Sequence, residues 1–295
     1  MPSLKEVRLR IASVKTTQQI TSAMKMVSAS KLRRAQNAIL TLRPYANKIN
    51  EILQNLTAAS GNSGDNLFFN SRYPEKVLLV VIASNRGMCG AFNASIIKTA
   101  IQYINENYPG QQNKGNVSLL CIGKKATDFF KKRNYNILAI HDHLFDQLTF
   151  DNTTDVARQL MQFFVSRQFD KIELVYNQFK NPAVQKLIVE QYLPFKPAEP
   201  APSAFTAKND YIFEPDEKTI TDELIPKSLT IQFYKALLDS FASEHGARMT
   251  AMHKATDNAQ EIIKKLTIMY NKARQATITN EILEIVSGAN ALKQS

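Results

Sequence analysis

The residues of this chain that are best placed to do chemistry are two polar turns that follow apolar runs. Ser84-Asn-Arg-Gly-Met-Cys-Gly90 follows the run 77–83, and Gly123-Lys124-Lys125 follows the run 117–122. A glycine turn between a strand and a helix can hold a phosphate, and a cysteine in such a turn can act as a nucleophile. Neither turn has the G-x-G-x-x-G spacing or the Gly-Lys-Ser/Thr ending of nucleotide-binding loops. We therefore interpret both as tight strand-to-helix turns that use glycine for its backbone freedom.

Other reactive side chains are scattered along the sequence. His141-x-His143 is the only close histidine pair, and no cysteine or carboxylate cluster accompanies it, so no metal site is expected. Cys89 would need a neighbouring base to act as a nucleophile, and the sequence supplies none. Cys89 and Cys121 lie in or near apolar segments, which predicts buried thiols in a reducing compartment. No catalytic, cofactor or metal site is predicted, so the chain is interpreted as a part of a larger assembly rather than an enzyme.

The two turns belong to a segment that alternates strand-like and helix-like patterns. Its first strand, Val77 to Ala83, is a continuous apolar run, which is typical of a parallel strand buried on both faces. Further strands are expected at Val117–Ile122, Ile137–Ile140, Lys171–Tyr176 and near Val184–Leu193, and helices at Asn93–Asn107, Lys124–Arg133 and Thr154–Phe169. The alternation predicts a Rossmann-like α/β domain with a mostly parallel sheet. Residues 60–64 and 194–210 are expected to be linkers.

A long helix is predicted before this domain. From Leu4 to Leu56 apolar residues recur in heptad register, as in a coiled coil, over ~80 Å of helix. In the middle of the segment the heptad positions are polar, and apolar residues occupy other positions, which predicts that the seam rotates or breaks there. The polar seam residues are Gln18, Thr21, Lys25 and Ser28, and the shifted apolar residues are Ile20, Ala23, Met24 and Val27. Pro44 predicts a local kink.

A second long helix is predicted after the domain, beginning at Pro226. Its heptad runs from Tyr234 to Ala276, and an antiparallel pair with the first helix would bury both seams. Its last turns carry an apolar stripe with no obvious local partner, which must be buried in another molecule. The stripe is Ile278, Ile282, Ile285 and Val286, and the polar residues on the same turns are Arg274, Gln275, Thr279, Glu281 and Glu284.

Composition limits the class of protein. The chain has 295 residues, 44% of them hydrophobic, and a net charge of +11. Residues 1–48 hold ten Lys or Arg against the single acid Glu6, so most of the excess charge lies there. Such a block favours a polyanion, an acidic protein surface or lipid headgroups as partner.

A nucleic-acid-binding coiled coil is the rival hypothesis, but the basic segment 1–48 has one aromatic ring, Tyr45, and no reading-helix motif. No run reaches the ~20 apolar residues of a membrane span, and residues 1–48 are too long and too regularly helical for a transit peptide.

Several separated blocks carry a resemblance to one family. They are Arg10-Ile-Ala-Ser-Val14, Thr17-Gln-x-Ile-Thr21, Ala23-Met-x-Met-Val27, Ser84-Asn-Arg-Gly-Met-Cys-Gly-Ala-Phe-Asn93, Ser243-Glu-x-x-Ala-Arg-Met249, Ala255-Thr-Asp-Asn-Ala259, Tyr270-Asn-Lys-Ala-Arg-Gln-Ala276, Ile278-Thr-x-Glu-x-x-Glu284 and Gly288-Ala-x-Ala291. Together they resemble the γ subunit of bacterial F-type ATP synthase over nearly the whole chain. Asn85, Met88 and Ala91 depart from the family's usual Asp, Leu and Gly, and all three lie in the first turn. The chloroplast-type regulatory cysteine pair of the family is absent from this sequence.

The resemblance implies a central rotor shaft without catalytic residues of its own. Three α and three β subunits would surround it, and proton flow would turn it so that the catalytic β sites change affinity in sequence. The ε subunit, the δ subunit and a ring of c subunits would complete the set of partners, with no nucleic acid, no cofactor and no membrane span in this chain. The implied location is the cytoplasmic face of the bacterial inner membrane, as a peripheral protein.

The resemblance also implies roles for individual residues. Arg274 and Gln275 would meet a loop of β, and Thr279, Glu281 and Glu284 would be further coupling positions. Met24 and Lys25 would pass an acidic segment of β. Tyr211 and Glu214 would belong to the foot that contacts the c ring and the ε side. The apolar residues Ile282 and Ile285 would turn in a hydrophobic sleeve of the α/β ring. The expected division is an N-terminal coiled-coil helix (1–58), the central domain (74–210), and the foot with the C-terminal helix (211–295).

Overall fold

The computed structural model describes residues 3–60, 67–70, 72–195 and 217–294. Its residues form two compact units, and the two long helices contribute to both. One unit comprises residues 1–28 with 249–295, and the other comprises residues 29–248. The predicted division at residues 58, 74 and 210 stays a prediction.

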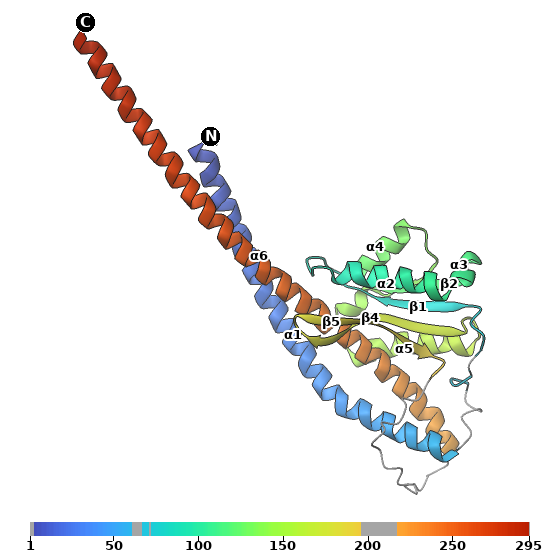
Figure 1. Cartoon of the computed structure of the whole chain (residues 1–295). Coiled ribbons are helices and arrows are strands. Elements are labelled where there is room, and N and C mark those ends of the chain that lie inside the picture. Colours follow the sequence, from blue (N-terminus) through green and yellow to red (C-terminus); the bar gives the residue numbers. More distant parts are fainter. Residues whose placement is uncertain (1–2, 61–66, 71, 196–216, 295) are drawn as a thin grey trace. The chain divides into compact units, whose positions relative to one another are not determined.

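A five-stranded sheet is the centre of the unit 29–248 (Figure 1). The strands are β1 (Val77–Ile82), β2 (Val117–Ile122), β3 (Ile137–Ile140), β4 (Lys171–Asn181) and β5 (Val184–Leu193). They lie in the order β3-β2-β1-β4-β5, and only β5 runs antiparallel to its neighbour. The predicted α/β fold with a mostly parallel sheet is confirmed.

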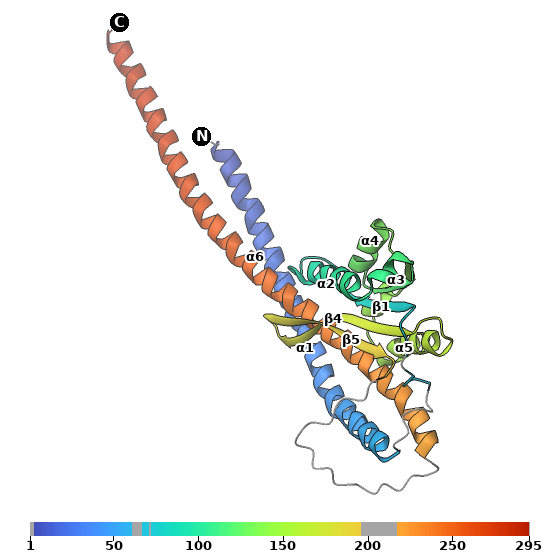
Figure 2. The same cartoon turned by 45° about the vertical axis from the view of Figure 1, so that its right-hand side comes forward.

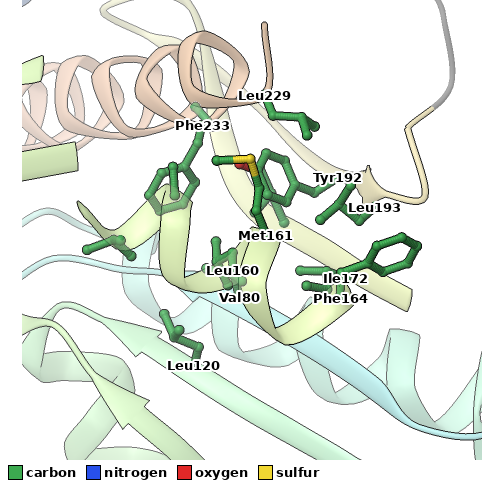
Figure 3. Close-up of a cluster of buried hydrophobic side chains, with 14 of the residues drawn as sticks. Val80, Leu120, Leu160, Met161, Phe164, Ile172, Tyr192, Leu193, Leu229 and Phe233 are labelled. Atoms are coloured by element: carbon green, nitrogen blue, oxygen red, sulfur yellow. The ribbon is translucent and has the colours of Figure 1, made fainter. Parts of the chain in front are cut away.

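Helices cover both faces of this sheet, as the continuous apolar runs of β1 and β2 require. Leu79 and Val81 of β1 pack with α2 (Phe92–Asn107) and α4 (Lys124–Lys132). Leu78 and Val80 face the opposite way, towards α5 (Phe150–Val165) and the first part of the last helix. Figure 3 shows this second core, where Phe164 of α5 lies beside Ile172 and Leu193, and Leu160 of α5 lies on the side of Phe233. The sheet is therefore buried on both sides, and only its edges and strand ends can offer a site.

Two helices account for nearly half of the chain. α1 spans Leu4–Ser60 and continues through Pro44, and α6 spans Glu217–Gln294. The prediction that α6 begins at Pro226 was wrong, because the helix begins nine residues earlier and Pro226 lies inside it. Pro226 can provide no amide to the preceding turn, but its carbonyl accepts a hydrogen bond of 2.8 Å from the Thr230 hydroxyl.

The unit that contains both chain ends is an antiparallel pair of helices, with the two segments side by side in Figures 1 and 2. Thr21 contacts Thr256 and Lys25 contacts His253, so the chain directions are opposite. Thr21 and Ser28 are buried, whereas Ile20 and Val27 are 54% and 59% exposed. The predicted rotation of the seam was therefore wrong: the heptad register continues with polar residues in it. A Thr hydroxyl can remain in a seam because it bonds to its own helix and across the pair, as Thr21 does with Gln18 and Thr256.

Smaller differences separate the predicted from the observed elements. α5 begins four residues before the predicted Thr154 and ends four residues before Phe169, because Thr149 caps its first turn through the Asn152 amide. The short helices α3 (Pro109–Asn113) and η1 (Asp142–Phe145) were not predicted. The predicted linker 194–210 begins with two buried residues, Pro194 and Phe195, and the rest of it from 196 onwards lies outside the described residues.

Candidate functional site

The carboxyl ends of β1 and β4 form the edge where an open α/β sheet ordinarily binds a ligand. β1 lies between β2 and β4, so the chain moves first to one side of β1 and later returns to the other. Such a switch point opens a crevice outside the strand ends, which dinucleotide-binding folds use. Here α6 crosses this position. The Ser240 hydroxyl donates to the Ile82 carbonyl over 3.4 Å, and the Ser243 hydroxyl donates to the Asn177 carbonyl over 3.0 Å.

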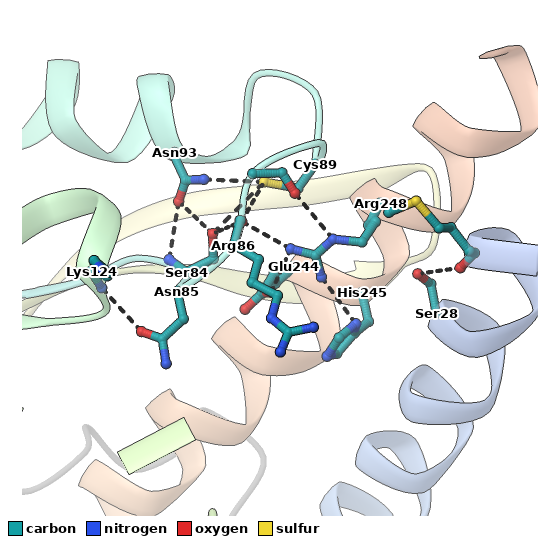
Figure 4. A network of polar contacts seen from close by, with 12 residues as sticks. Ser28, Ser84, Asn85, Arg86, Cys89, Asn93, Lys124, Glu244, His245 and Arg248 are labelled. Carbon is teal, nitrogen blue, oxygen red and sulfur yellow. Dashed lines mark hydrogen bonds and ion pairs between the residues drawn. The ribbon is translucent and has the colours of Figure 1, made fainter. Parts of the chain in front are cut away.

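Arg248 attaches the next turn of α6 to the loop after β1 (Figure 4). Its guanidinium donates to the carbonyls of Gly87 (3.3 Å) and Arg86 (3.0 Å), and it pairs with the Glu244 carboxylate at 2.7 Å. The remaining nitrogen lies 3.2 Å from Nδ1 of His245. Burial and the neighbouring positive charge of Arg248 lower the pKa of His245 to about 3, so this imidazole is neutral and accepts the bond. Burial raises the pKa of Glu244, but the ion pair opposes that change.

The first turn is closed by bonds within itself. The amide and hydroxyl of Ser84 both donate to the Asn93 side-chain oxygen, at 3.0 and 2.9 Å, and the Asn93 amide donates to the Cys89 sulfur at 3.1 Å. Cys89 and Cys121 are 2% and 0% exposed, which confirms the predicted buried thiols. Burial raises the pKa of the Cys89 thiol, so it is protonated at neutral pH and is a poor nucleophile.

The second turn packs directly against the end of β1. Gly123 has φ of +100°, and a Cβ there would lie 2.2 Å from the Ala83 carbonyl oxygen, so only glycine fits. The amide of Lys124 donates to the Asn85 side chain, and the amide of Lys125 donates to the Ser84 carbonyl. The amides that begin α4 are thus used by β1 and its loop, rather than being left for a phosphate.

The two histidines after β3 do not meet around a common point. His141 is half-buried, and burial lowers its pKa, whereas the His143 side chain is fully exposed and lies 3.7 Å from the Asp146 carboxylate. Within the described ranges, no three histidine, cysteine or acidic side chains lie close enough to hold a metal.

The predicted coupling residues of α6 lie in its last turns, residues 274–289, which we call the α6 tip. Arg274, Gln275, Glu281 and Glu284 are exposed, and the exposed Thr279 donates its hydroxyl to the Gln275 carbonyl over 2.9 Å. The apolar residues of the tip are also exposed: Ile278 47%, Ile282 54%, Leu283 60%, Ile285 71% and Val286 51%. Figures 1 and 2 show that the tip extends beyond the beginning of α1. The structure therefore brings the candidate polar and apolar residues together on one unpaired helix segment.

The other predicted positions have different environments. Lys25 is half-buried in the helix pair, with its Nζ 3.3 Å from Nδ1 of His253, and Met24 is half-buried. Tyr211 and Glu214 lie outside the described residues.

Sequence reasoning missed the attachment of α6 to the sheet. In the sequence, Glu244 and Arg248 are an acid and a base four residues apart on a helix, and such pairs are common on exposed helix faces. Both side chains are in fact 8% exposed. The available signal was the pattern of small hydroxyl residues, Ser240 and Ser243, on the same face as that pair. The arrangement defines a class of protein. It is an α/β domain in which a long helix covers the sheet edge that other α/β folds use to bind a cofactor, and the same helix continues into a coiled coil.

Comparison with known proteins identifies the family. The family model described as ATP synthase matches residues 3–292. The chain is 54% identical over 292 residues to the ATP synthase gamma chain of Flavobacterium johnsoniae, with 99% of each chain covered. It is 45% identical over 294 residues to that of Chlorobaculum parvum, with 100% of each covered. The chain therefore belongs to the ATP synthase family, as one of its gamma chains, which are non-catalytic subunits.

Solved structures share the fold. One is a chain in the mitochondrial ATP synthase of Euglena gracilis, solved with OSCP, F1 and c-ring in rotational state 3. It aligns with a TM-score of 0.65 and 20% sequence identity, and the alignment covers 98% of this chain and 94% of that chain. A chain of the rotor of the same enzyme in rotational state 1 aligns with a TM-score of 0.63, also at 20% identity, covering 93% and 98%. In the described part of the present chain, no helix is long and apolar enough to cross a membrane.

Proposed function

We propose that this chain is the central rotor shaft of a bacterial F-type ATP synthase, and that it couples proton flow to the conformational cycle of the catalytic β subunits. The observation that carries the proposal is the α6 tip, where five apolar side chains between 47% and 71% exposed share a few turns with charged residues. Fully burying one such side chain contributes about 1.5 to 3 kcal/mol. A surrounding ring of subunits would supply that burial.

The helix pair has properties that suit a shaft. Its seam contains buried apolar residues, Ala259 and Leu266, and also buried polar residues, Thr21 and Ser28. The two helices support each other along such a seam, and the outer face of the pair carries single exposed apolar residues, such as Ile20 and Val27, that a surrounding ring of subunits would contact. Charges such as Arg274 and Lys25 would then interact with the surrounding ring at moderate strength. The roles of Met24, Lys25, Arg274, Gln275, Thr279, Glu281 and Glu284 as contacts to α and β are part of this proposal.

The closed edge of the sheet supports a mechanical role for the α/β domain. The crevice that would bind a nucleotide is crossed by α6, and Arg248 joins that helix to the loop after β1. A domain attached in this way can pass a force to the helix instead of binding a cofactor. We further propose that Tyr211 and Glu214 meet the c ring and ε, that δ belongs to the same complex, and that the complex lies on the cytoplasmic face of the inner membrane.

Native mass spectrometry of the complex that purifies with the tagged chain tests this proposal. The expected result is one copy of this chain with three copies each of two larger subunits. The chain alone, or a complex in which it is present in three copies, would contradict the proposal, because a shaft must be single on the axis of a threefold ring.

A further inference from the structure

A cavity of about 500 Å³ lies in the unit 29–248, between α1, the β4–β5 pair and the first part of α6. Its volume is in the range of small-molecule sites, which is roughly 300 to 1,000 Å³. Much of its wall is apolar and comes from all three elements, including Ile39 and Leu42 of α1, Phe179 of β4 and Ile231 of α6. None of the roles discussed above uses this cavity.

A carboxylate lines the cavity without a partner. Asp239 is 5% exposed, and within the described ranges it makes no hydrogen bond and no ion pair. The neighbouring acid Glu190 differs, because it accepts hydrogen bonds from the Tyr176 hydroxyl (2.6 Å) and from the Gln232 amide (2.7 Å). A buried charge without a partner is costly, so Asp239 is the group in this wall that a ligand would satisfy.

The charges around the cavity are arranged by depth. Arg43 and Lys235 also line it, and although both residues are exposed, so that water weakens their charges, these charges still lower the pKa of Asp239. The acids Asp239 and Glu190 are buried and half-buried, respectively. A ligand in the cavity would therefore meet exposed cations and more deeply buried acceptors in the same wall. Anionic ligands would face two carboxylates, and a purely apolar ligand would remove the remaining water from Asp239 without replacing its hydrogen bonds.

We propose that this cavity binds a small organic cation, an ammonium or amidinium group on an apolar body, whose N–H groups pair with the Asp239 carboxylate. The apolar body would pack between Ile39, Leu42 and Ile231, and the side-chain amide of Gln178 in the lining would be available to a polar substituent. Charge-assisted bonds to a buried carboxylate are about twice as strong as neutral ones. This combination of an apolar wall with one unpaired acid favours a cation over its neutral isostere.

The protonation of Asp239 gives a second expectation. Burial raises the pKa of Asp239 to about 6, with the charges of Lys235 and Arg43 lowering it and that of Glu190 raising it. Tyr176, from β4, is a further titratable group that interacts with Asp239. Cation binding needs the ionised carboxylate, so affinity should fall as the pH decreases below 6. At pH 5 about one tenth of the carboxylate would be ionised, which predicts an affinity about tenfold lower than at pH 8.

Titration of the full-length chain with benzamidinium and with its neutral isostere benzamide, followed by calorimetry, tests the proposal. We expect benzamidinium to bind at least about tenfold more tightly than benzamide at pH 8. The isosteric variant Asp239→Asn should abolish that preference, whereas Asp151→Asn, at an exposed acid on α5, should leave it unchanged. Thermal unfolding of each variant checks that it is folded. The pH dependence of benzamidinium affinity is measured on the unmodified chain, so it tests the proposal even if a variant fails to fold.

Three results would overturn the proposal. Equal binding of the two probes would remove the need for a charge, and unchanged binding by Asp239→Asn would place the cation elsewhere. If the isolated chain binds the probe and the assembled complex does not, a basic side chain of a partner subunit occupies the cavity in the complex, and the cavity is not a small-molecule site.

Discussion

Glu244 and Arg248, one turn apart on α6, form an ion pair of 2.7 Å in which both side chains are 8% exposed. The same guanidinium donates to two carbonyls of the loop after β1, more than 160 residues away in the sequence. Ion pairs within a helix usually lie on its surface and contribute little. This one is buried because α6 occupies the crevice of the sheet, so it connects the long helix to the α/β domain.

The first prediction concerns this connection. Arg248→Met should lower the free energy of unfolding by about 3 to 5 kcal/mol, because it leaves the Glu244 carboxylate buried without its partner. Glu244→Gln in the same chain keeps a hydrogen-bond acceptor for Arg248, so its cost should be smaller. Urea unfolding of the two variants and of Arg158→Met, whose pair with Asp155 is exposed, measures the difference. Equal stability of Arg248→Met and Arg158→Met would show that the buried pair does not hold the helix.

The second prediction uses the buried Asp239. Its pKa is raised from the ordinary 3.8 to about 6, so the folded state binds this proton more tightly than the unfolded state. The stability contributed by the protonated group is therefore full below pH 4 and is lost as the pH rises to about 6, by up to about 3 kcal/mol. Asp239→Asn should be more stable than the unmodified chain at pH 7.5, and the two should converge near pH 4.

Urea unfolding at both pH values measures this difference. His245, also on α6, has a pKa lowered to about 3 and changes stability in the opposite direction in acid, but this contribution is common to both proteins and cancels. A gap between the two proteins that is the same at pH 4 and pH 7.5 would mean that Asp239 does not titrate in this range.

The third prediction concerns the glycine of the second turn. Gly123→Ala places a Cβ 2.2 Å from the Ala83 carbonyl oxygen in a left-handed backbone, and it should destabilise the domain by several kcal/mol or prevent its folding. Gly110→Ala is the matched control, because nothing lies within 4 Å of its added Cβ. Its effect should stay within about 0.5 kcal/mol. Thermal unfolding of both variants measures the difference in stability. A Gly123→Ala chain as stable as the unmodified chain would contradict the close packing of β1 and α4.

The fourth prediction concerns the α6 tip. Ile282→Asp should weaken assembly or torque and reduce ATP-driven proton pumping in inverted membrane vesicles, because the charge would enter an apolar sleeve. Asn280→Asp adds the same charge at an exposed polar position two residues away and should leave pumping nearly intact. The sheet domain of both variants should stay folded, which the unfolding of the isolated chain reports. Normal pumping by Ile282→Asp would remove the tip from the proposed bearing.

The sequence was sufficient to predict the strands β1 and β2 because their apolar runs are short and end in turns, whereas β4 continues five residues beyond the predicted Tyr176. β2 and β3 have the predicted bounds, and β5 lies where it was expected. The polar seam of the helix pair was not predictable from hydrophobicity, because Thr21 and Ser28 are buried while Ile20 and Val27 face outward. Apolar residues on the outer face have a reason to be there only if another molecule covers them, which a pattern within one chain does not reveal.

The contacts at the sheet edge left only a weak sequence signal, the hydroxyl residues Ser240 and Ser243 on the helix face of Glu244 and Arg248. Ser240, Ser243 and Arg248 read as an ordinary polar helix face, and their partners are backbone carbonyls, which carry no side-chain signal. The exposed α6 tip, in contrast, was predicted from its stripe, because no other segment of the chain had a complementary pattern. The residues proposed to contact the partner subunits depend on the family resemblance and on the tests above.

Rotation of the assembled complex tests whether this chain is a rotor shaft. A bead attached through a cysteine at the exposed Lys114, observed on single complexes fixed by their ring, would report the motion of the α/β domain. We expect ATP to drive this bead in one direction, with three dwell positions in each turn. ATP hydrolysis at a normal rate with a stationary bead, on complexes shown to contain the chain, would contradict it.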